Sequence, residues 1–241
     1  MTRHATPLPA GHPCLACDVR TIAVCGVLDC GDLARMRTLG RTMRLKAGQP
    51  IFHEGDQATR VFTVTSGTLK LYKLLADGRR QITGFMFPGD FMGISVDDEH
   101  AFTVEALDDA ILCSFPRNRF DEFAGEHPQL ERELYRLATH ELAAAQRQMV
   151  LLGRKTAVER LASFFITLLD RTGKMVEDGR EYIDLPMSRS DVADYLGLTK
   201  ETVSRVLALL KDQRLIRLDT LNRIEILDGG RLVDMAEGVT D

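Results

Sequence analysis

The sequence predicts an α+β fold with an N-terminal antiparallel β-roll of jelly-roll type, a long helix, and a C-terminal unit of short helices with a β-ribbon. Turn glycines recur at intervals of 11 or 12 residues between β-prone runs in the first half of the chain. Apolar residues then repeat with heptad spacing, and two capped helices precede an alternating ribbon. We therefore expect four segments, at residues 1–30, 31–125, 126–152 and 153–241.

The composition is that of a soluble globular protein, with 44% apolar and 27% charged residues. The net charge of −4 means that any surface that binds nucleic acid must be local. The N-terminus has no apolar signal core, and the most apolar run, 164–169, is too short to span a bilayer. We expect a cytoplasmic protein without a membrane partner, whose five cysteines stay reduced.

Residues 31–125 predict one helix, over 32–39, followed by the β-roll. Turn signals at Gly55, Gly67, Gly78 and Gly89 separate β-prone runs such as 61–65 and 69–74. Short strands at this spacing favour an antiparallel sandwich or barrel.

The stretch 88–103 is where such a roll would bind the phosphate of a cyclic nucleotide. It contains no arginine and has three consecutive acidic residues, so we expect no cyclic nucleotide there. Catalysis with a metal would depend on His53, Glu54 and His100, which we expect to be surface or turn residues. No nucleophile motif, P-loop or dinucleotide fingerprint occurs, so the protein is not expected to be an enzyme.

A long helix is predicted over 126–152, and its apolar positions step by three and four residues. This heptad pattern fits a helix that packs on its own β-roll or one that forms a two-stranded seam with a second copy of the chain. We favour the seam between two copies, because helix-turn-helix proteins usually bind DNA as dimers. The predicted dimer seam consists of Tyr135, Ala138, Leu142, Ala145, Met149 and Leu152.

The C-terminal segment begins with a helix over 156–169 and a loop or hairpin over 173–184. A helix-turn-helix follows. Ser188 with Asp191 has the form of a capping box, Gly197 supplies the turn, and Thr199 can cap the second helix. The alternating runs 214–218 and 223–227 complete a winged helix-turn-helix.

Glu201, Ser204 and Arg205 share the exposed face of the second helix near its N-terminus. Arginine can contact guanine with two hydrogen bonds, and a carboxylate can accept one from cytosine N4. Glu201 and Arg205 could instead form an ordinary surface ion pair, but the capped helices, turn and ribbon in order favour DNA binding. The residues predicted to bind DNA are Ser188, Thr199, Lys200, Glu201, Ser204 and Arg205.

Three cysteines, Cys14, Cys17 and Cys25, lie close together in the leader, and Cys113 stands in a distant apolar run. Such a set can wrap a soft metal centre, and the wide spacing to Cys25 favours an iron–sulfur cluster. Zinc and thiol redox chemistry without a cofactor remain alternatives. Cys30 could replace Cys25, and Cys113 could be an apolar core residue.

Four motifs resemble the CRP/FNR regulators. They are Gln81–Phe85, Pro88–Asp90, Val158–Ala162 and Tyr195–Arg205. With the leader cysteines, the chain is most similar to the oxygen-sensing FNR branch of FnrN/FnrL/AadR type from α-proteobacteria. The resemblance implies the cyclic-nucleotide-binding-domain fold for the β-roll.

The resemblance also implies a [4Fe–4S] cluster held by Cys14, Cys17, Cys25 and Cys113, because the Cys-x2-Cys-x7-Cys spacing is similar to that of the α-proteobacterial members. Cys30 is then dispensable. The E-x2-S-R residues would read a TTGAT-N4-ATCAA-like palindrome.

We therefore expect an oxygen-responsive homodimer that mainly activates anaerobic or microaerobic genes by contacting RNA polymerase, for which the acidic turn 97–100 is a candidate. The alternative is a family member without a cluster that senses thiol redox state, nitric oxide or haem.

Overall fold

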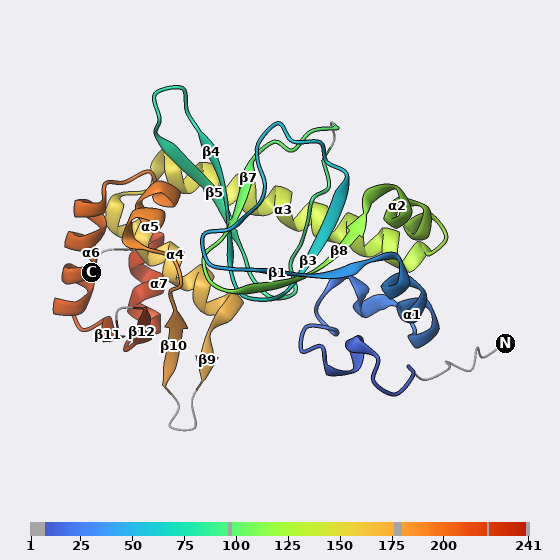
Figure 1. The fold of residues 1–241 in the computed structure, drawn as a ribbon. Helices are drawn as coiled ribbons and strands as arrows, with labels where there is room; N and C mark the ends of the chain where they lie inside the picture. The colour runs from blue at the N-terminus through green and yellow to red at the C-terminus, as the bar shows by residue number, and fades with distance from the viewer. Residues whose placement is uncertain (1–7, 96–97, 176–179, 221, 240–241) are drawn as a thin grey trace. The chain divides into compact units, whose positions relative to one another are not determined.

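The computed structural model describes residues 8–95, 98–175, 180–220 and 222–239 (Figure 1). The chain divides into two compact units. We call the first, residues 1–73 and 83–142, the sensor unit and the second, residues 74–82 and 143–241, the DNA-binding unit, after the functions that the sequence predicts for them. No described helix is long and apolar enough to cross a membrane.

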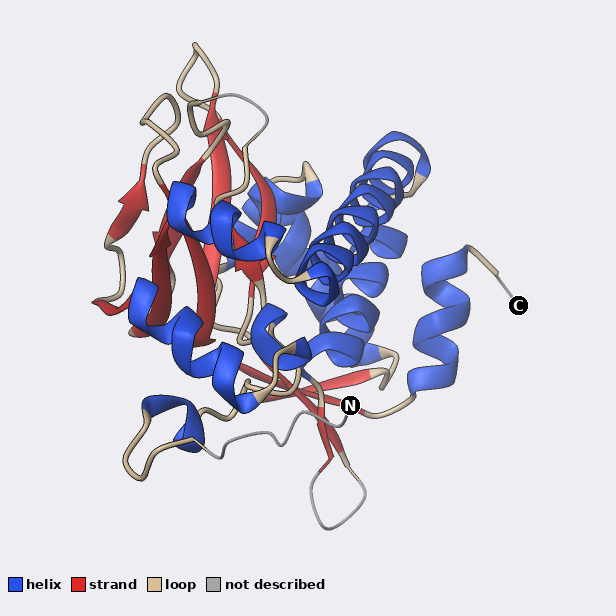
Figure 2. Ribbon diagram, turned by 90° about the vertical axis from the view of Figure 1, so that its right-hand side faces the viewer, coloured by secondary structure: helices blue, strands red, loops and turns tan. Residues whose placement is uncertain are grey.

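The leader of the sensor unit contains two single-turn 3-10 helices, η1 (Pro13–Ala16) and η2 (Val24–Val27), joined by loops (Figure 2). The first regular helix, α1 (Cys30–Leu39), follows at once. Its N-terminus is capped by Asp29, whose Oδ1 accepts a hydrogen bond from the amide of Asp32 at 2.8 Å. The leader is therefore built of tight turns that end in a capped helix.

Two antiparallel sheets form the β-roll, as the spacing of the turn glycines predicts. One sheet has the order β1-β8-β3-β6 and the other β2-β7-β4-β5. The first contains β1 (Arg41–Leu45), β3 (Arg60–Ser66), β6 (Phe91–Met92) and β8 (Ala110–Pro116). The second contains β2 (Pro50–Phe52), β4 (Leu69–Leu74), β5 (Arg80–Met86) and β7 (Thr103–Ala106). Leu45, Phe62, Val64, Leu69 and Leu112 are buried between them.

A helix that the sequence did not predict, α2 (Arg117–Gly125), follows β8 directly. Phe120, Phe123 and Ala124 are buried on one of its faces. The ring of Phe120 lies 5.1 Å from that of Phe91 and 6.0 Å from that of Phe115. At nine residues, α2 carries too short a repeat to stand out in the sequence, and its burial against the β-roll stabilises it.

The long helix α3 spans Pro128–Arg154, close to the expected range of 126–152. Leu130 is its only residue that is buried among those described. Tyr135, Leu142 and Met149 of the predicted seam are 73%, 61% and 71% exposed. Ala138 and Ala145 are exposed as well, and Leu152 is half-buried. The heptad stripe is therefore uncovered in the single chain.

The DNA-binding unit contains a third sheet of four strands, with the order β11-β12-β10-β9. The predicted ribbon forms β11 (Ile216–Thr220) and β12 (Arg223–Ile226), and the segment expected as a loop or hairpin forms β9 (Lys174–Met175) and β10 (Glu181–Asp184). Its helices are α4 (Ala157–Thr172), α5 (Arg189–Leu196), α6 (Lys200–Asp212) and α7 (Gly229–Glu237). The sequence analysis did not predict α7.

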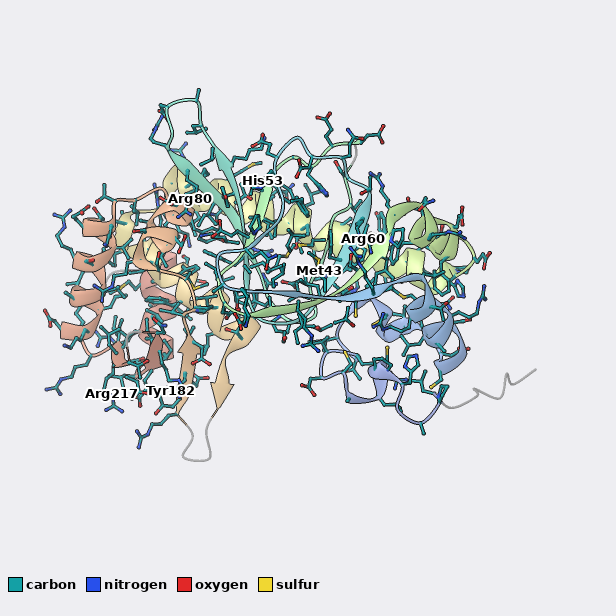
Figure 3. All side chains as sticks on the ribbon, viewed as in Figure 1. Met43, His53, Arg60, Arg80, Tyr182 and Arg217 are labelled. Atoms are coloured by element: carbon teal, nitrogen blue, oxygen red, sulfur yellow. The ribbon has the colours of Figure 1, made fainter. Side chains whose placement is uncertain are left out.

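Across this sheet, Tyr182 of β10 and Arg217 of β11, both labelled in Figure 3, are register partners of Glu225 in β12, the middle strand of the three. Glu225 is only 3% exposed, and its carboxylate forms an ion pair with the guanidinium of Arg217. Such cross-strand neighbours hold the register of a sheet. The wing is thus joined to the hairpin before it, a pairing that the sequence did not predict.

Candidate cysteine centre and DNA interface

Four of the five cysteines line one pocket of the sensor unit. Cys14 lies in η1, Cys17 directly follows it, Cys25 lies in η2, and Cys113 lies in β8. Arg20, Arg37 and Thr63 are among the other lining residues. The pocket therefore brings together the four cysteines that the sequence analysis selected.

Cys30 is not among the residues that line this pocket. It begins α1, and its Sγ accepts a hydrogen bond from Nη2 of Arg20 at 3.5 Å. Between the two candidates for the third leader position, the structure thus puts Cys25 beside Cys14, Cys17 and Cys113.

Apolar contacts fix the leader against the rest of the sensor unit. Val24 and Leu28, on either side of Cys25, are buried in a core that includes Leu33 and Met36 of α1. Cys14 is oriented by its backbone amide, which donates a hydrogen bond to Nδ1 of His12 at 3.2 Å. A leader with little regular structure is therefore anchored at the turns that carry its thiols.

Burial raises the pKa of Cys25 to about 12, and the nearby thiols of Cys14, Cys17 and Cys113 raise it further. Burial also raises the pKa values of Cys14 and Cys113, while the charge of Arg37 acts in the opposite direction on both. With their pKa values raised, the thiols of Cys14, Cys25 and Cys113 are protonated at neutral pH. They become thiolates when a positively charged centre compensates for their charge.

The donor set fits an iron–sulfur cluster, which cysteine thiolates hold. Among the described residues, no three or more His, Cys, Asp or Glu side chains converge closely enough to bind a metal ion. The four cysteines line one pocket, and four thiolates are a donor set for an iron–sulfur cluster as well as for a zinc ion. The cavity holds about 30 Å³, room for roughly two water molecules, so the thiols would have to move apart to admit a cluster.

In the DNA-binding unit, α5 and α6 form the predicted helix-turn-helix. Ser188 and Asp191 form the capping box of α5, with the amide of Asp191 donating to Oγ of Ser188 at 3.1 Å. Gly197 has a φ of 62°, the left-handed conformation that ends α5 at little steric cost. Thr199 caps α6 through a hydrogen bond from the amide of Thr202 at 3.1 Å.

The exposed face of α6 carries the predicted reading residues. Glu201 and Arg205 are exposed and Ser204 is half-buried, whereas Val203, Val206, Leu207 and Leu210 are buried. Arg205 donates to Oγ1 of Thr202 at 3.2 Å, and no ion pair among the described residues joins it to Glu201. Both charged groups are therefore presented to solvent beside Lys200, the first residue of α6.

Three side chains that the sequence did not single out hold the C-terminal end of α5. Gln81 Nε2 donates to the carbonyl oxygen of Asp194 at 2.7 Å, and Gln148 Nε2 to that of Tyr195 at 3.0 Å. Arg160 Nη1 donates to the carbonyl oxygen of Leu196 at 2.9 Å. These bonds satisfy carbonyl groups that a helix end leaves without partners. Gln81 and Arg160 belong to motifs of the family resemblance, but nothing in the local sequence indicates their partners.

The structure corrects one expectation about the β-roll. His100 is not a surface residue, because it is only 6% exposed and its ring stacks on Phe52 with centroids 3.5 Å apart. His53 is exposed, as expected. The acidic turn proposed to contact RNA polymerase begins at residue 97, which lies outside the described residues, so that expectation stays a prediction.

The fold and this helix-turn-helix define a DNA-binding regulator with an N-terminal β-roll. Residues 42–127 match the family of the cyclic nucleotide-binding domain, and residues 159–235 match that of the Crp-like helix-turn-helix domain. The chain is 41% identical to the nitrogen fixation regulation protein FixK of Bradyrhizobium diazoefficiens over 95% of both chains. It belongs to the CRP/FNR family of transcriptional regulators.

Two further comparisons support the same family. The transcriptional activator protein FnrL of Cereibacter sphaeroides is 35% identical over the whole chain and 98% of its own length. The solved structure of FixK2 from Bradyrhizobium japonicum is 36% identical and superposes with a TM-score of 0.75, covering 81% of this chain and 96% of that one. The predicted fold class and family are thereby confirmed.

Proposed function

We propose that the protein is an oxygen-responsive regulator, mainly an activator, that binds DNA as a homodimer when Cys14, Cys17, Cys25 and Cys113 hold a [4Fe–4S] cluster. The observation that carries the proposal is that these four cysteines line one pocket while Cys30 lies outside it. Relatives with the printed names of transcriptional activators, FnrL and AadR, cover 100% and 90% of the chain and support activation.

The cluster would supply a centre that oxygen can oxidise. Three thiolates of the leader and one of β8 would hold it, and they would thereby connect a segment of tight turns to the β-roll. When those bonds are lost, the leader retains its apolar contacts through Val24 and Leu28 but loses its connection to Cys113. The sensor unit therefore has a tied and a loosened state, which is the kind of bistable element that a switch requires.

The exposed stripe on α3 connects this switch to DNA binding. Pairing of two stripes would bury Tyr135, Leu142 and Met149, which water surrounds in the single chain. A symmetric dimer presents two copies of α6 about 34 Å apart, one turn of DNA. Both half-sites of a TTGAT-N4-ATCAA-like palindrome would then be read together, and a monomer would lose the contacts to one of them.

The reading chemistry follows from the exposed face of α6. Arg205 can donate two hydrogen bonds to O6 and N7 of a guanine, and Glu201 can accept one from a cytosine amino group. The hydroxyl groups of Ser188 and Thr199 cap α5 and α6. We therefore assign these two residues, with Lys200, to contacts with the sugar–phosphate backbone of the DNA and not to its bases.

Operator binding at two oxygen levels tests the proposal. Fluorescence anisotropy with a labelled palindrome should give tight binding by protein prepared without oxygen, and a loss of at least tenfold in affinity within minutes in air. The matched control is the same palindrome with both half-sites changed. Equal affinity before and after air would contradict oxygen control and leave DNA binding intact.

The second candidate is a family member without a cluster. A small free cavity of about 30 Å³ favours it, since a cluster would enter this space only if the lining thiols moved apart. Direct sensing by thiol oxidation fits less well, because reactive cysteines have lowered pKa values and burial raises those of Cys14, Cys25 and Cys113. Nitric oxide or haem would then be the signal, and iron without sulfide would identify haem.

A further inference from the structure

The pocket that contains the four cysteines has an unusual charge balance. Its lining residues include two arginines, Arg20 and Arg37, and no aspartate or glutamate. Four thiolates would bring four negative charges into a largely apolar space. Burying such charge is costly unless positive charge lies close by. The lining thus supplies the sign of charge that the thiolates need.

Arg37 is the arginine that the fold holds in place. It lies in the last turn of α1, where Nη1 donates to the carbonyl oxygen of Gly40 at 3.1 Å and Nη2 donates to Oγ1 of Thr42 at 2.7 Å. Thr42 of β1 is the register partner of Cys113 in β8. Two hydrogen bonds therefore fix the guanidinium next to the strand position that carries the fourth thiol.

The second arginine is oriented differently. Arg20 donates to Sγ of Cys30, which does not line the pocket. Arg37 lines the pocket together with Cys14 of the leader and Cys113 of the β-roll, and its guanidinium is held on Thr42, directly opposite Cys113. It is thus the cation shared by the two parts of the chain that the thiolates would connect.

We propose that Arg37 is a positioning residue of the cysteine centre, whose fixed positive charge stabilises the thiolate set and raises the reduction potential of the cluster. This inference rests on the proposed function. Net charge and surrounding groups set the potential of an iron–sulfur cluster, and a nearby cation favours the more negative, reduced state. Arg37 would also slow the loss of iron, because it stabilises the ligands as thiolates.

Two substitutions separate charge from structure. Arg37→Gln removes the charge but introduces an amide that can still donate hydrogen bonds. Arg37→Lys keeps the charge but loses the guanidinium, which donates through two nitrogen atoms. The matched control is Arg35→Gln on the same helix, which removes a guanidinium that pairs with Glu126 at 3.1 Å and does not line the pocket. All proteins are purified without oxygen, and iron and sulfide are counted first.

Reduction potential and the rate of iron loss to a chelator without oxygen are then measured for the loaded proteins. Arg37→Gln should lower the potential by about 59 mV, a tenfold change in the equilibrium constant for one electron, and speed iron loss about tenfold. Arg37→Lys should recover most of both, and Arg35→Gln should match the unchanged protein.

The possible failures are distinct. If Arg37→Gln has the potential and loss rate of Arg35→Gln, the inference is wrong while the proposed function stands. If Arg37→Lys behaves like Arg37→Gln, the role is structural and the inference is also overturned. An unchanged protein that contains no iron and no sulfide would overturn both the proposed function and the inference.

Discussion

Nη2 of Arg80 lies 2.7 Å from Oδ1 of Asp191, so an arginine of β5 is paired with the carboxylate that completes the capping box of α5. The same guanidinium contacts Asp194 at 2.7 Å. The side chain of Asp191 is only 8% exposed, and its other oxygen accepts a hydrogen bond from the amide of Ser188 at 3.0 Å. One arginine thus supports the first helix of the DNA-binding motif at its N-terminal cap.

Arg80→Ala should destabilise the DNA-binding unit by about 1–3 kcal/mol, because it leaves a buried carboxylate without its charged partner. Affinity for the palindrome should fall with it, since α5 positions α6. Urea denaturation and anisotropy measure the two effects. Arg79→Ala is the control, because Arg79 pairs with the exposed Asp77 in the turn and should change neither quantity. Equal effects of the two substitutions would contradict the role of Arg80.

Arg205→Ala should lose about 1–3 kcal/mol of discrimination at one guanine of each half-site, because the bidentate contact to O6 and N7 is gone. Anisotropy with palindromes changed at single positions measures this loss. Lys211→Ala at the opposite end of α6 should keep the full preference. Unchanged discrimination in the Arg205 variant would show that this side chain does not read bases.

Met149→Glu should shift the protein from dimer to monomer, because it places a charge on each side of an apolar seam. Analytical ultracentrifugation measures the mass, and operator affinity should fall in parallel. Gln146→Glu adds the same charge at an exposed position of α3 outside the stripe and should leave a dimer. A dimer of unchanged stability in the Met149 variant would show that the dimer interface lies on another surface.

Acid should destabilise the sensor unit through His100. Burial lowers the pKa of His100 below its ordinary value of about 6.5, so the unfolded chain binds the proton more readily than the folded one. Stability is then lost as pH falls from about 6.5 through the lower, folded value. Urea midpoints between pH 7.5 and 5 should show this loss, and it should be smaller in His100→Asn. His53→Asn, which removes an exposed imidazole, should retain the full dependence.

Much of this fold was predictable because its signals are local. The turn glycines of the β-roll, the capping residues Ser188 and Thr199, and Gly197 each act on the chain within a few residues. The helix α2 and the contact of Arg80 with Asp191 were not predicted. The first depends on burial of Phe120 and Phe123 against distant strands, and the second joins residues that are 111 apart in the sequence.

The candidate cysteine site also has a part that the sequence predicts and a part that only the fold reveals. Spacing within the leader selected Cys14 and Cys17, and the family resemblance selected Cys25 over Cys30. Proximity of Cys113 to the leader depends on how β8 pairs with β1 and β3, which no local pattern encodes. The anchoring of Arg37 on Thr42 depends on the same pairing, so the arginine was not a candidate from the sequence.

The visible absorption spectrum of protein purified without oxygen, with counts of iron and acid-labile sulfide, tests the central claim most directly. The account predicts a brown protein with a broad band near 400 nm, about four iron and four sulfide per chain, and a change within minutes of exposure to air. Cys25→Ala and Cys113→Ala should be colourless while Cys30→Ala keeps the band. A colourless unchanged protein, or full iron and sulfide in Cys113→Ala, would contradict it.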